Sequence, residues 1–274
     1  MQAASSPWLP LTFGGIAAFA RASLFRLLAV EFVIGLVCAA SVICLFYLGW
    51  EPPVHGAIAR LPDAGALRGG ILEWSGPSPE RLAEGSFLSI VVDLFDTREL
   101  GHVGDVQLEF GERHLRIRSL FGYLSIPYPQ SITISLNRMN VEPWWGAWHP
   151  VFAAMLGLFT IVMLFIAWSL LALLYMPMIR IIALFADRNI TLAGAWQTAC
   201  ACLIPGALLM SAGVAAYACR QINLLQLLFV GAFHLAFAWP FVLLSPWRLP
   251  RLGDAMIASK NPFADPRMKL KIDE

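Results

Sequence analysis

The stretch "WHPVFAAMLGLFTIVMLFIAWSLLALLY", residues 148–175, decides the fold of this chain. It contains no Asp, Glu, Lys or Arg over its whole length. A helix needs about 20 apolar residues to cross the hydrocarbon core of a bilayer, whereas a surface helix of a soluble protein keeps a polar face. The stretch therefore predicts a transmembrane helix.

Three more runs of the same kind occupy residues 25–50, 192–217 and 224–244. They explain why 58% of the chain is hydrophobic and only 14% is charged, since soluble domains average about 45–50% and about 25% respectively. The predicted fold class is an α-helical membrane protein with four transmembrane helices. Residues 51–147, between the first two helices, are predicted to form a small β-rich extracytoplasmic domain.

The segment between the first two helices changes character along its length. Its first part is rich in turn formers, and strand signals follow in "FLSIVVDLF" (87–95) and "SITISLNR" (131–138). We expect a small, mainly antiparallel sheet. The segment holds no cysteine, so no disulfide framework supports it. All cysteines fall in or at the end of the apolar runs and are interpreted as small packing residues: Cys38, Cys44, Cys200, Cys202 and Cys219.

The charged stretch "DVQLEFGERHLRIRS", residues 105–119, alternates apolar and polar residues. A turn at residues 111–112 predicts a hairpin in which Glu109 lies opposite His114. The same register pairs Phe110 with Arg113, Leu108 with Leu115, Val106 with Ile117, Gln107 with Arg116, and Asp105 with Arg118. One face is then apolar, and the other pairs acids or an amide with bases. Sheet architecture thus explains this cluster better than a catalytic or metal-binding role.

Basic residues outside the predicted outer domain are concentrated at one side of the helices. They are Arg21, Arg26, Arg180, Arg188, Arg248, Arg251, Lys260, Arg267, Lys269 and Lys271. The positive-inside rule therefore places both termini in the cytoplasm and residues 51–147 on the outer side of the membrane. Residues 148–245 form a three-helix transmembrane module, and residues 246–274 form a basic cytoplasmic tail.

The N-terminal residues 1–24 form a cytoplasmic or interfacial segment. The helix at 25–50 is too long for the apolar region of a signal peptide, so it is predicted to be an uncleaved signal anchor. Two alternatives stay open for "LTFGGIAAFARASLF" (11–25). It is either an amphipathic helix along the inner interface or a loosely ordered lead-in.

Tryptophans cluster where the predicted helices enter or leave the bilayer. The group in "EPWWGAWHP" (142–150) precedes the second helix, and others mark the outer end of the first helix and the inner end of the last. Such positions are typical of an aromatic belt at the membrane interface. The predicted anchors are Trp50, Trp144, Trp145, Trp148 and Trp247. A sugar-binding platform is the alternative for the three tryptophans of 142–150.

Polar residues inside a membrane are functional candidates by default. Glu31 lies near the cytoplasmic end of the first helix, where it can reach the interface or pair with Arg26 or with an arginine of the inner loop. Gln197 and His234 are interpreted as hydrogen-bonding partners between helices, or as functional groups. Pro205, in the third helix, and Pro240, late in the fourth, are expected to kink their helices.

No catalytic, cofactor-binding or metal-binding residue is assigned from motifs. The sequence lacks a Gly-rich phosphate loop, a GxSxG elbow, HExxH and CxxC. The remaining outer candidates, Asp93, Asp96, His102 and Asp105, match neither an EF-hand loop nor a zinc spacing. Turn hydrogen bonding is their expected role.

One resemblance adds to this reading. The layout of one helix, an outer β-rich domain and three helices, together with "MPMIRIIALFADRNITLAGAWQTACACLIPGALLMSAG" (176–213), resembles the DUF1189 family of bacterial membrane proteins. "GGILEW" and "SIPYP" in the outer domain add to the likeness. The third helix is also distantly similar to the Yip1 membrane module. Some members of DUF1189 are associated with maltodextrin utilisation, which implies an accessory role near a sugar transporter.

Three functions are compared. The preferred one is a non-enzymatic accessory or scaffold protein whose outer domain and helix bundle bind partner proteins. The alternative is a transporter component or a permease-like subunit with the topology of FtsX or MacB, with Glu31 and His234 near its path. The third is a membrane enzyme that uses Asp93, Asp96 or His102 with a metal. Expected partners are membrane lipid and another membrane subunit or a second copy, with no nucleic acid and no cofactor.

Overall fold

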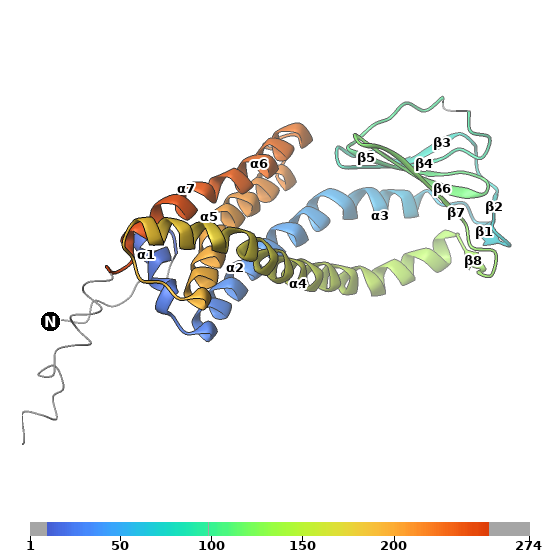
Figure 1. The fold of residues 1–274 in the computed structure, drawn as a ribbon. Helices are drawn as coiled ribbons and strands as arrows, with labels where there is room; N and C mark the ends of the chain where they lie inside the picture. Colours follow the sequence, from blue (N-terminus) through green and yellow to red (C-terminus); the bar gives the residue numbers. More distant parts are fainter. Residues whose placement is uncertain (1–9, 98, 252–274) are drawn as a thin grey trace, which may run out of the picture. The chain divides into compact units, whose positions relative to one another are not determined.

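The computed structural model describes residues 10–97 and 99–251, so residues 1–9 and most of the predicted basic tail lie outside the described residues. The fold is mostly helical with a small region of β-sheet (Figure 1). Four helices among the described residues are long and apolar enough to cross a membrane. They are Leu24–Ala59, Arg138–Phe185, Leu192–Ala218 and Leu224–Arg248. The prediction of four long apolar helices and a small β-rich region is confirmed.

The first two long helices extend well beyond the predicted spans. The first consists of α2 (Leu24–Leu45), the π-helical turn η2 (Phe46–Trp50) and α3 (Glu51–Ala59). The second, α4 (Arg138–Phe185), has 48 residues and is about 72 Å long at 1.5 Å per residue. The expectation of turns from residue 51 was wrong, and the second helix continues to Phe185, past the predicted end of its span at residue 175. Apolar content marks where a helix can lie in a membrane, but a helix that has formed gains one hydrogen bond for each residue added and can extend past that span.

A pair of prolines explains the wide turn in the first long helix. Pro52 and Pro53 lie at the start of α3, directly after the π-helical turn. In an uninterrupted α-helix they would lack the bonds to the Leu48 and Gly49 carbonyls, and their rings would clash there. Proline is tolerated in the first turn of a helix, because the N–H is not needed. The wide turn therefore lets the helix continue through a sequence that favours a break.

Proline interrupts one of the last two long helices but not the other. Pro205 lies inside α5 (Leu192–Ala218), which remains helical throughout. The fourth long helix is divided into α6 (Leu224–Phe237) and α7 (Trp239–Leu244), followed by η3 (Ser245–Arg248). The helix is interrupted at Ala238, two residues before Pro240. An interruption is expected near proline, because proline cannot donate a backbone hydrogen bond and disfavours helical backbone in the residue before it.

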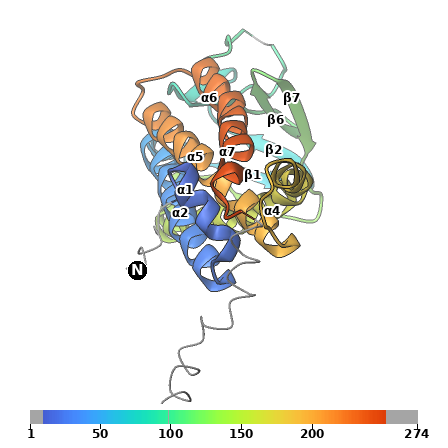
Figure 2. The same ribbon diagram turned by 60° about the vertical axis from the view of Figure 1, so that its left-hand side comes forward.

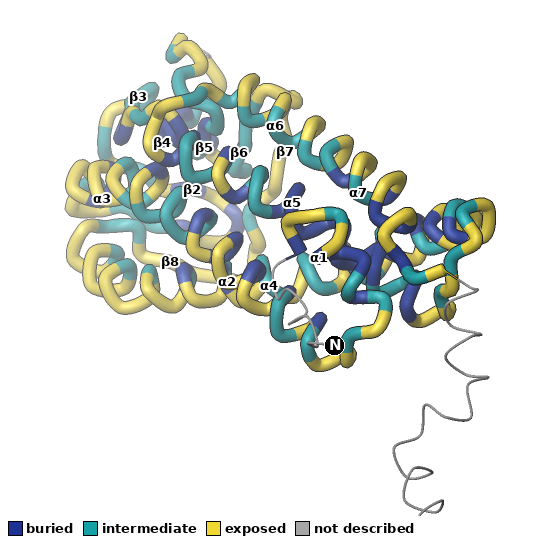
Figure 3. The backbone as a smooth tube through the Cα atoms, turned by 90° about the vertical axis from the view of Figure 1, so that its left-hand side faces the viewer, coloured by how far each residue is buried: buried dark blue, intermediate teal, exposed yellow. Residues whose placement is uncertain are grey.

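The chain divides into two compact units. Among the described residues, the helical unit comprises 10–38, 160–212 and 228–251, and the mixed unit comprises 39–97, 99–159 and 213–227. In the helical unit, α5 supplies a run of small buried residues: Ala195, Ala199, Cys200, Ala201, Cys202 and Ala207. Small side chains allow helix backbones to approach closely. By contrast, α6 has no buried residue and is drawn mostly in yellow and teal (Figure 3).

The N-terminal stretch is helical and packed. Thr12 caps the short helix α1 (Phe13–Ala18), which leads into the 3₁₀ turn η1 (Phe19–Arg21). Helix α1 lies beside α7 in the helical unit (Figure 2), and the Phe13 and Phe241 rings are 5.3 Å apart. Ile16 and Phe19 are fully buried. Of the two alternatives for residues 11–25, the structure favours a helix over a loose lead-in.

The mixed unit contains two sheets. The three-stranded sheet has the order β2-β1-β8, with β1 at Gly65–Arg68, β2 at Ile71–Trp74 and β8 at Ile134–Ser135. The five-stranded sheet runs in chain order from β3 to β7: Glu80–Ala83, Leu88–Val92, Val106–Phe110, His114–Ser119 and Gly122–Pro127. The strand predicted at 131–138 is reduced to β8, because α4 begins at Arg138.

The five-stranded sheet is antiparallel except for β4 and β5, which run parallel. A parallel pair needs a connection that crosses a face of the sheet. Residues 93–105 make this connection, and they are called the crossover loop below. The opposite face carries Leu88, Ile90 and Val92 into the apolar core that also includes Ala57 of α3.

The hairpin of β5 and β6 forms as predicted, but its register is different. Phe110 lies opposite Leu115 and Glu109 opposite Arg116. Residues 111–113 separate the two strands, and a hydrogen bond from Gly111 N to His114 O at 3.0 Å closes the loop. The predicted turn at 111–112 was therefore too short. Because the error is an even number of residues, each side chain remains on its predicted face.

Candidate functional site

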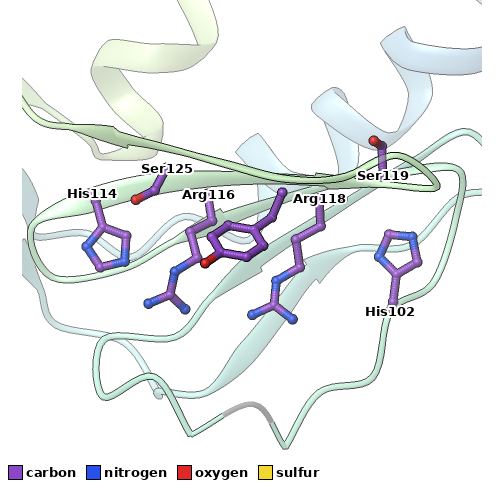
Figure 4. A pocket seen from close by; sticks show the side chains of 8 residues that line it. His102, His114, Arg116, Arg118, Ser119 and Ser125 are labelled. Carbon is purple, nitrogen blue, oxygen red and sulfur yellow. The ribbon is translucent and has the colours of Figure 1, made fainter.

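A cleft of 540 Å³ opens on the polar face of the five-stranded sheet. His114, Arg116 and Arg118 project from β6 to the same side, because alternate residues of a strand share a face. His102 approaches from the crossover loop opposite them (Figure 4). The lining is completed by Ser119, Gly122, Tyr123 and Ser125. We call this site the basic cleft.

A buried carboxylate fixes both arginines of the basic cleft. Glu109 is only 3% exposed. It accepts hydrogen bonds from Arg116 Nη1 at 2.8 Å and from Arg118 Nη2 at 2.9 Å. Arg116 also pairs with Asp96, and this hydrogen bond raises the pKa of the Arg116 guanidinium above its ordinary value. The two guanidinium groups are thus permanent cations held in a set direction before any ligand arrives.

The crossover loop is attached to the sheet by polar contacts. The Val103 amide donates to Gln107 Oε1 at 3.3 Å, and Gln107 is fully buried. Arg81 Nη2, on β3, donates to the Gly101 carbonyl at 3.0 Å. Gln107 and Glu109 of β5 are therefore buried under the loop and do not face solvent. The face that the sequence predicts to be polar is buried under this loop along β5 and open along β6 and β7.

Three carboxylates, two from the crossover loop and one from β5, come close together. Oxygen atoms of Asp93, Asp96 and Glu109 all lie within 4.8 Å of one another. Such oxygens suit a divalent cation, but Arg116 already pairs with Asp96 and Glu109. The Asp93 carboxylate accepts from the Thr97 amide at 3.1 Å. Ion pairing and loop hydrogen bonds account for this trio, so we assign no metal site there.

The chemistry of the basic cleft suits binding of an anionic group. Guanidinium groups bind carboxylate and phosphate through directed hydrogen bonds. The Arg118 side chain is 27% exposed and so still reaches the cleft. Tyr123 is 75% exposed and offers an aromatic face beside it. Fixed cations, imidazoles, hydroxyls and one exposed ring together favour an acidic ligand with some apolar surface.

Glu31 is the most deeply placed of the predicted polar candidates in the helices. It is 3% exposed, and its hydrogen-bonding neighbour is the Cys200 thiol of α5. Its Oε1 atom has no hydrogen-bond partner within the described part of the chain. The Arg26 guanidinium, an expected partner, lies over the Phe19 ring at 5.1 Å. Burial of a carboxyl group without full pairing is costly, which keeps Glu31 a functional candidate.

The other two predicted candidates are less buried. Gln197 is half-buried on α5. The His234 ring is also half-buried, and its Nδ1 contacts the Gly231 carbonyl of its own helix rather than a neighbouring helix. The prediction of a side-chain bond from His234 across a helix interface was therefore wrong. It is the His234 backbone carbonyl that faces α5, at Gly206.

The predicted tryptophan anchors are largely exposed. Trp50, Trp144, Trp148 and Trp247 are between 37% and 55% exposed. Trp144, Trp145 and Trp148 each pack against Phe152, with ring centroids 5.9 to 6.1 Å apart. This grouping follows from helical spacing along α4. It leaves both interpretations open, the interface anchor and the sugar platform.

Two groups of side chains were not found by reading the sequence. The first is the basic cleft as a whole, because the stretch 105–119 was explained by sheet pairing alone. Tyr123 and Ser125 stand opposite Arg118 and Arg116 in the ladder, and "GYLSIP" could have indicated this alternation. The second group is Glu51 with His55 and His149. The spacing of Glu51 and His55 by one helical turn was the available signal, but two prolines favoured a loop.

Comparison with family models, with curated proteins and with solved structures gives no match to this chain. The resemblance to DUF1189 therefore stays a prediction.

Proposed function

We propose that this chain is a multi-pass protein of the bacterial inner membrane that acts as a non-enzymatic accessory or scaffold protein. Both termini are cytoplasmic, and residues 51–147 are extracytoplasmic. The basic cleft binds an acidic group of a partner membrane protein. The resemblance to DUF1189 extends this proposal to a partner that is a sugar transporter.

The observation that carries the proposal is the fixed direction of Arg116 and Arg118. Both are held by Glu109, which is nearly inaccessible to solvent. A binding surface whose cations are already ordered loses little conformational entropy when a partner binds. The four apolar helices support placement in a membrane, and the basic residues near their predicted inner ends support the orientation.

A photo-crosslinking amino acid at position 123 tests the proposal in native membranes. Tyr123 lines the basic cleft, and the matched control position, Met139, is 87% exposed and lies in the same unit. We expect an adduct with another membrane protein from position 123 and none of that mass from position 139. Arg118→Ala should weaken the adduct. The same adducts from both positions, or no adduct from position 123, would contradict the proposal.

Purification of the full chain from native membranes in mild detergent identifies the partner class. A co-purifying transporter that is also the crosslinked species supports the accessory role. A chain recovered alone as a homo-oligomer, with an adduct to itself, would replace a hetero-complex with self-association.

Glu31 favours a second candidate function, that of a transporter component. A buried carboxyl with one oxygen unpartnered within the described residues is typical of proton relays in membrane helices. The full chain in liposomes, with a pH-sensitive dye inside, tests for proton flux under an applied pH gradient. Flux that Glu31→Gln abolishes, while Gln197→Ala retains it, would support transport. His234→Ala measures whether the imidazole contributes. No flux above that of empty liposomes would contradict intrinsic proton transport.

A further inference from the structure

Strand β7 (Gly122–Pro127) forms one edge of the five-stranded sheet, and β6 is its neighbour on the inner side. All of its residues are exposed. Natural edge strands are usually protected by charged side chains, by proline or by a covering segment. Strand β7 has no charged residue, and its one proline, Pro127, lies at its end. We propose that β7 accepts an extended segment of the partner protein as a sixth strand, and that this segment alternates acidic and apolar residues. The inference rests on the proposed function, since it describes how the partner's acidic group reaches the basic cleft.

The hydrogen bonds between β6 and β7 determine which backbone groups of β7 face outward. The Tyr128 amide donates to the Arg113 carbonyl at 3.1 Å. Residue pairs in an antiparallel ladder alternate between bonded and non-bonded positions. By this alternation Leu124 bonds to β6, whereas Tyr123 and Ser125 direct their N–H and C=O groups away from it. These outward groups are the ones that an added strand would bond.

The two faces of β7 differ in chemistry. Tyr123 and Ser125 line the basic cleft. Leu124 and Ile126 lie on the opposite face, because successive side chains of a strand alternate, and they are 59% and 42% exposed. A sixth strand would continue both faces outward. Alternate residues of that strand would lie beside the basic cleft, and the residues between them would cover exposed apolar side chains.

Charge complementarity indicates that the polar residues of the added strand are acidic. The charged residues that line the basic cleft are all basic. The Glu109 side chain that orients Arg116 and Arg118 is only 4% exposed, so it does not compete for a ligand at the surface. Ser125 stands opposite Arg116 in the ladder (Figure 4). A strand beyond β7 lies about 10 Å from β6, and a glutamate and an arginine side chain together span this distance over the small serine.

A second copy of this chain fits the edge less well than an acidic segment does. Strand β7 carries no acidic residue. Pairing two β7 strands would therefore place two basic clefts side by side with no carboxylate from either strand to bind them. The partner segment that satisfies both faces has acidic residues separated by single apolar residues.

Ser125→Pro tests strand addition separately from the acidic contact. The Ser125 N–H faces outward, so proline removes a donor that β6 does not use, and edge strands tolerate proline at such positions. The full chain in native membranes carries the photo-crosslinking amino acid at position 123. Ser125→Pro should lower the adduct yield roughly tenfold, because one hydrogen bond is lost and a ring obstructs the edge. The matched control, Ser125→Ala, keeps the N–H and should retain the adduct.

The adduct yields separate this inference from the proposed function. Loss of the adduct in Arg118→Ala but not in Ser125→Pro would keep an acidic partner in the basic cleft and overturn strand addition. Absence of any adduct from position 123 of the otherwise unchanged chain would contradict the proposed function, and strand addition with it. An adduct of twice the mass of the chain would show that β7 meets a second copy, and would overturn the acidic partner segment.

A second variant protects the test if Ser125→Pro folds poorly. Hydrogen exchange of β4, whose residues are all buried, shows whether the sheet remains intact. Leu124→Gln leaves the backbone unchanged and removes only the exposed apolar surface that the added strand would cover. It should lower the adduct yield roughly fivefold. An unchanged yield in Leu124→Gln would overturn the proposal, whatever the state of the proline variant.

Mass spectrometry of the digested adduct tests the chemistry of the partner segment. The peptide joined to position 123 should contain acidic residues separated by single apolar residues. A joined peptide without an acidic residue would overturn the proposal.

Discussion

The Tyr217 hydroxyl donates a hydrogen bond to the Asp105 carboxylate. This contact ties the last turn of α5 to the end of the crossover loop within the mixed unit. The Phe87 ring packs edge-on against Tyr217 at 4.7 Å, and the Arg220 guanidinium lies 5.9 Å from the centre of Phe87. The β-rich domain is thereby held by a segment more than a hundred residues later in the sequence.

Tyr217→Phe should loosen this attachment. The substitution keeps the ring and removes only the hydroxyl, so Asp105 loses a partner. We expect the unfolding free energy to fall by about 1–2 kcal/mol, with faster hydrogen exchange at the start of β5. Mass spectrometry of amide exchange on the full chain in detergent measures this. Tyr123→Phe is the control, because that hydroxyl is on an exposed residue. Unchanged exchange in Tyr217→Phe would show that ring packing alone holds the contact.

Glu109→Ala should cost more stability than any exposed acidic substitution. It leaves Arg116 and Arg118 without their shared buried counterion, and breaking a buried pair from one side costs about 3–5 kcal/mol. Thermal unfolding followed by near-ultraviolet circular dichroism checks the size of the loss. The effect should be smaller in Glu109→Gln, which still accepts hydrogen bonds.

Glu142→Ala is the matched control for that experiment. Glu142 also pairs with an arginine, Arg138, at 3.0 Å, but both side chains are more than half exposed. An exposed pair of this kind is worth about 0.3–0.5 kcal/mol. Equal losses in Glu109→Ala and Glu142→Ala would mean that the Glu109 network does not organise the basic cleft.

The native cysteines offer a test of the proposed orientation. Cys219, just after α5, is exposed, whereas Cys38, Cys200 and Cys202 are buried. If the termini are cytoplasmic, Cys219 lies on the outer side. A membrane-impermeant maleimide should then label intact spheroplasts, and Cys219→Ser should remove the signal. Labelling that requires permeabilised membranes would reverse the orientation.

The sequence predicts helices and strands well where its apolar residues form one continuous run or recur at one regular spacing. The apolar runs predict the four long helices, and alternation in 105–119 predicts β5, β6 and the face of each side chain. The register is missed because the loop includes Glu112 and Arg113, and turn length depends on contacts such as the hydrogen bond from Leu72 N to Glu112 O at 2.7 Å. Long-range pairings of this kind leave no local signal.

The candidate sites are harder to predict, because they depend on tertiary neighbours. His102 reaches the basic cleft only because the parallel pair of β4 and β5 carries the crossover loop over the sheet. Glu51 and His55 lie on one helix face only because Pro52 and Pro53 are accommodated by a π-helical turn. Propensity favours a break there, and packing overrides it.

Gly206→Ala should destabilise the helical unit, because the added Cβ would clash with a neighbouring backbone atom. The same substitution at Gly231 would cause no clash. A Cβ at Gly206 would lie 2.6 Å from the His234 carbonyl oxygen of α6. Backbone atoms cannot turn aside as a flexible side chain can, so α5 and α6 must separate. We expect a loss of about 1–3 kcal/mol, measured by thermal unfolding in detergent. At Gly231, also on α6, a Cβ meets nothing within 4 Å. Gly231→Ala should therefore be neutral or slightly stabilising, since alanine favours a helix. Equal behaviour of the two variants would show that α5 and α6 do not pack this closely at Gly206.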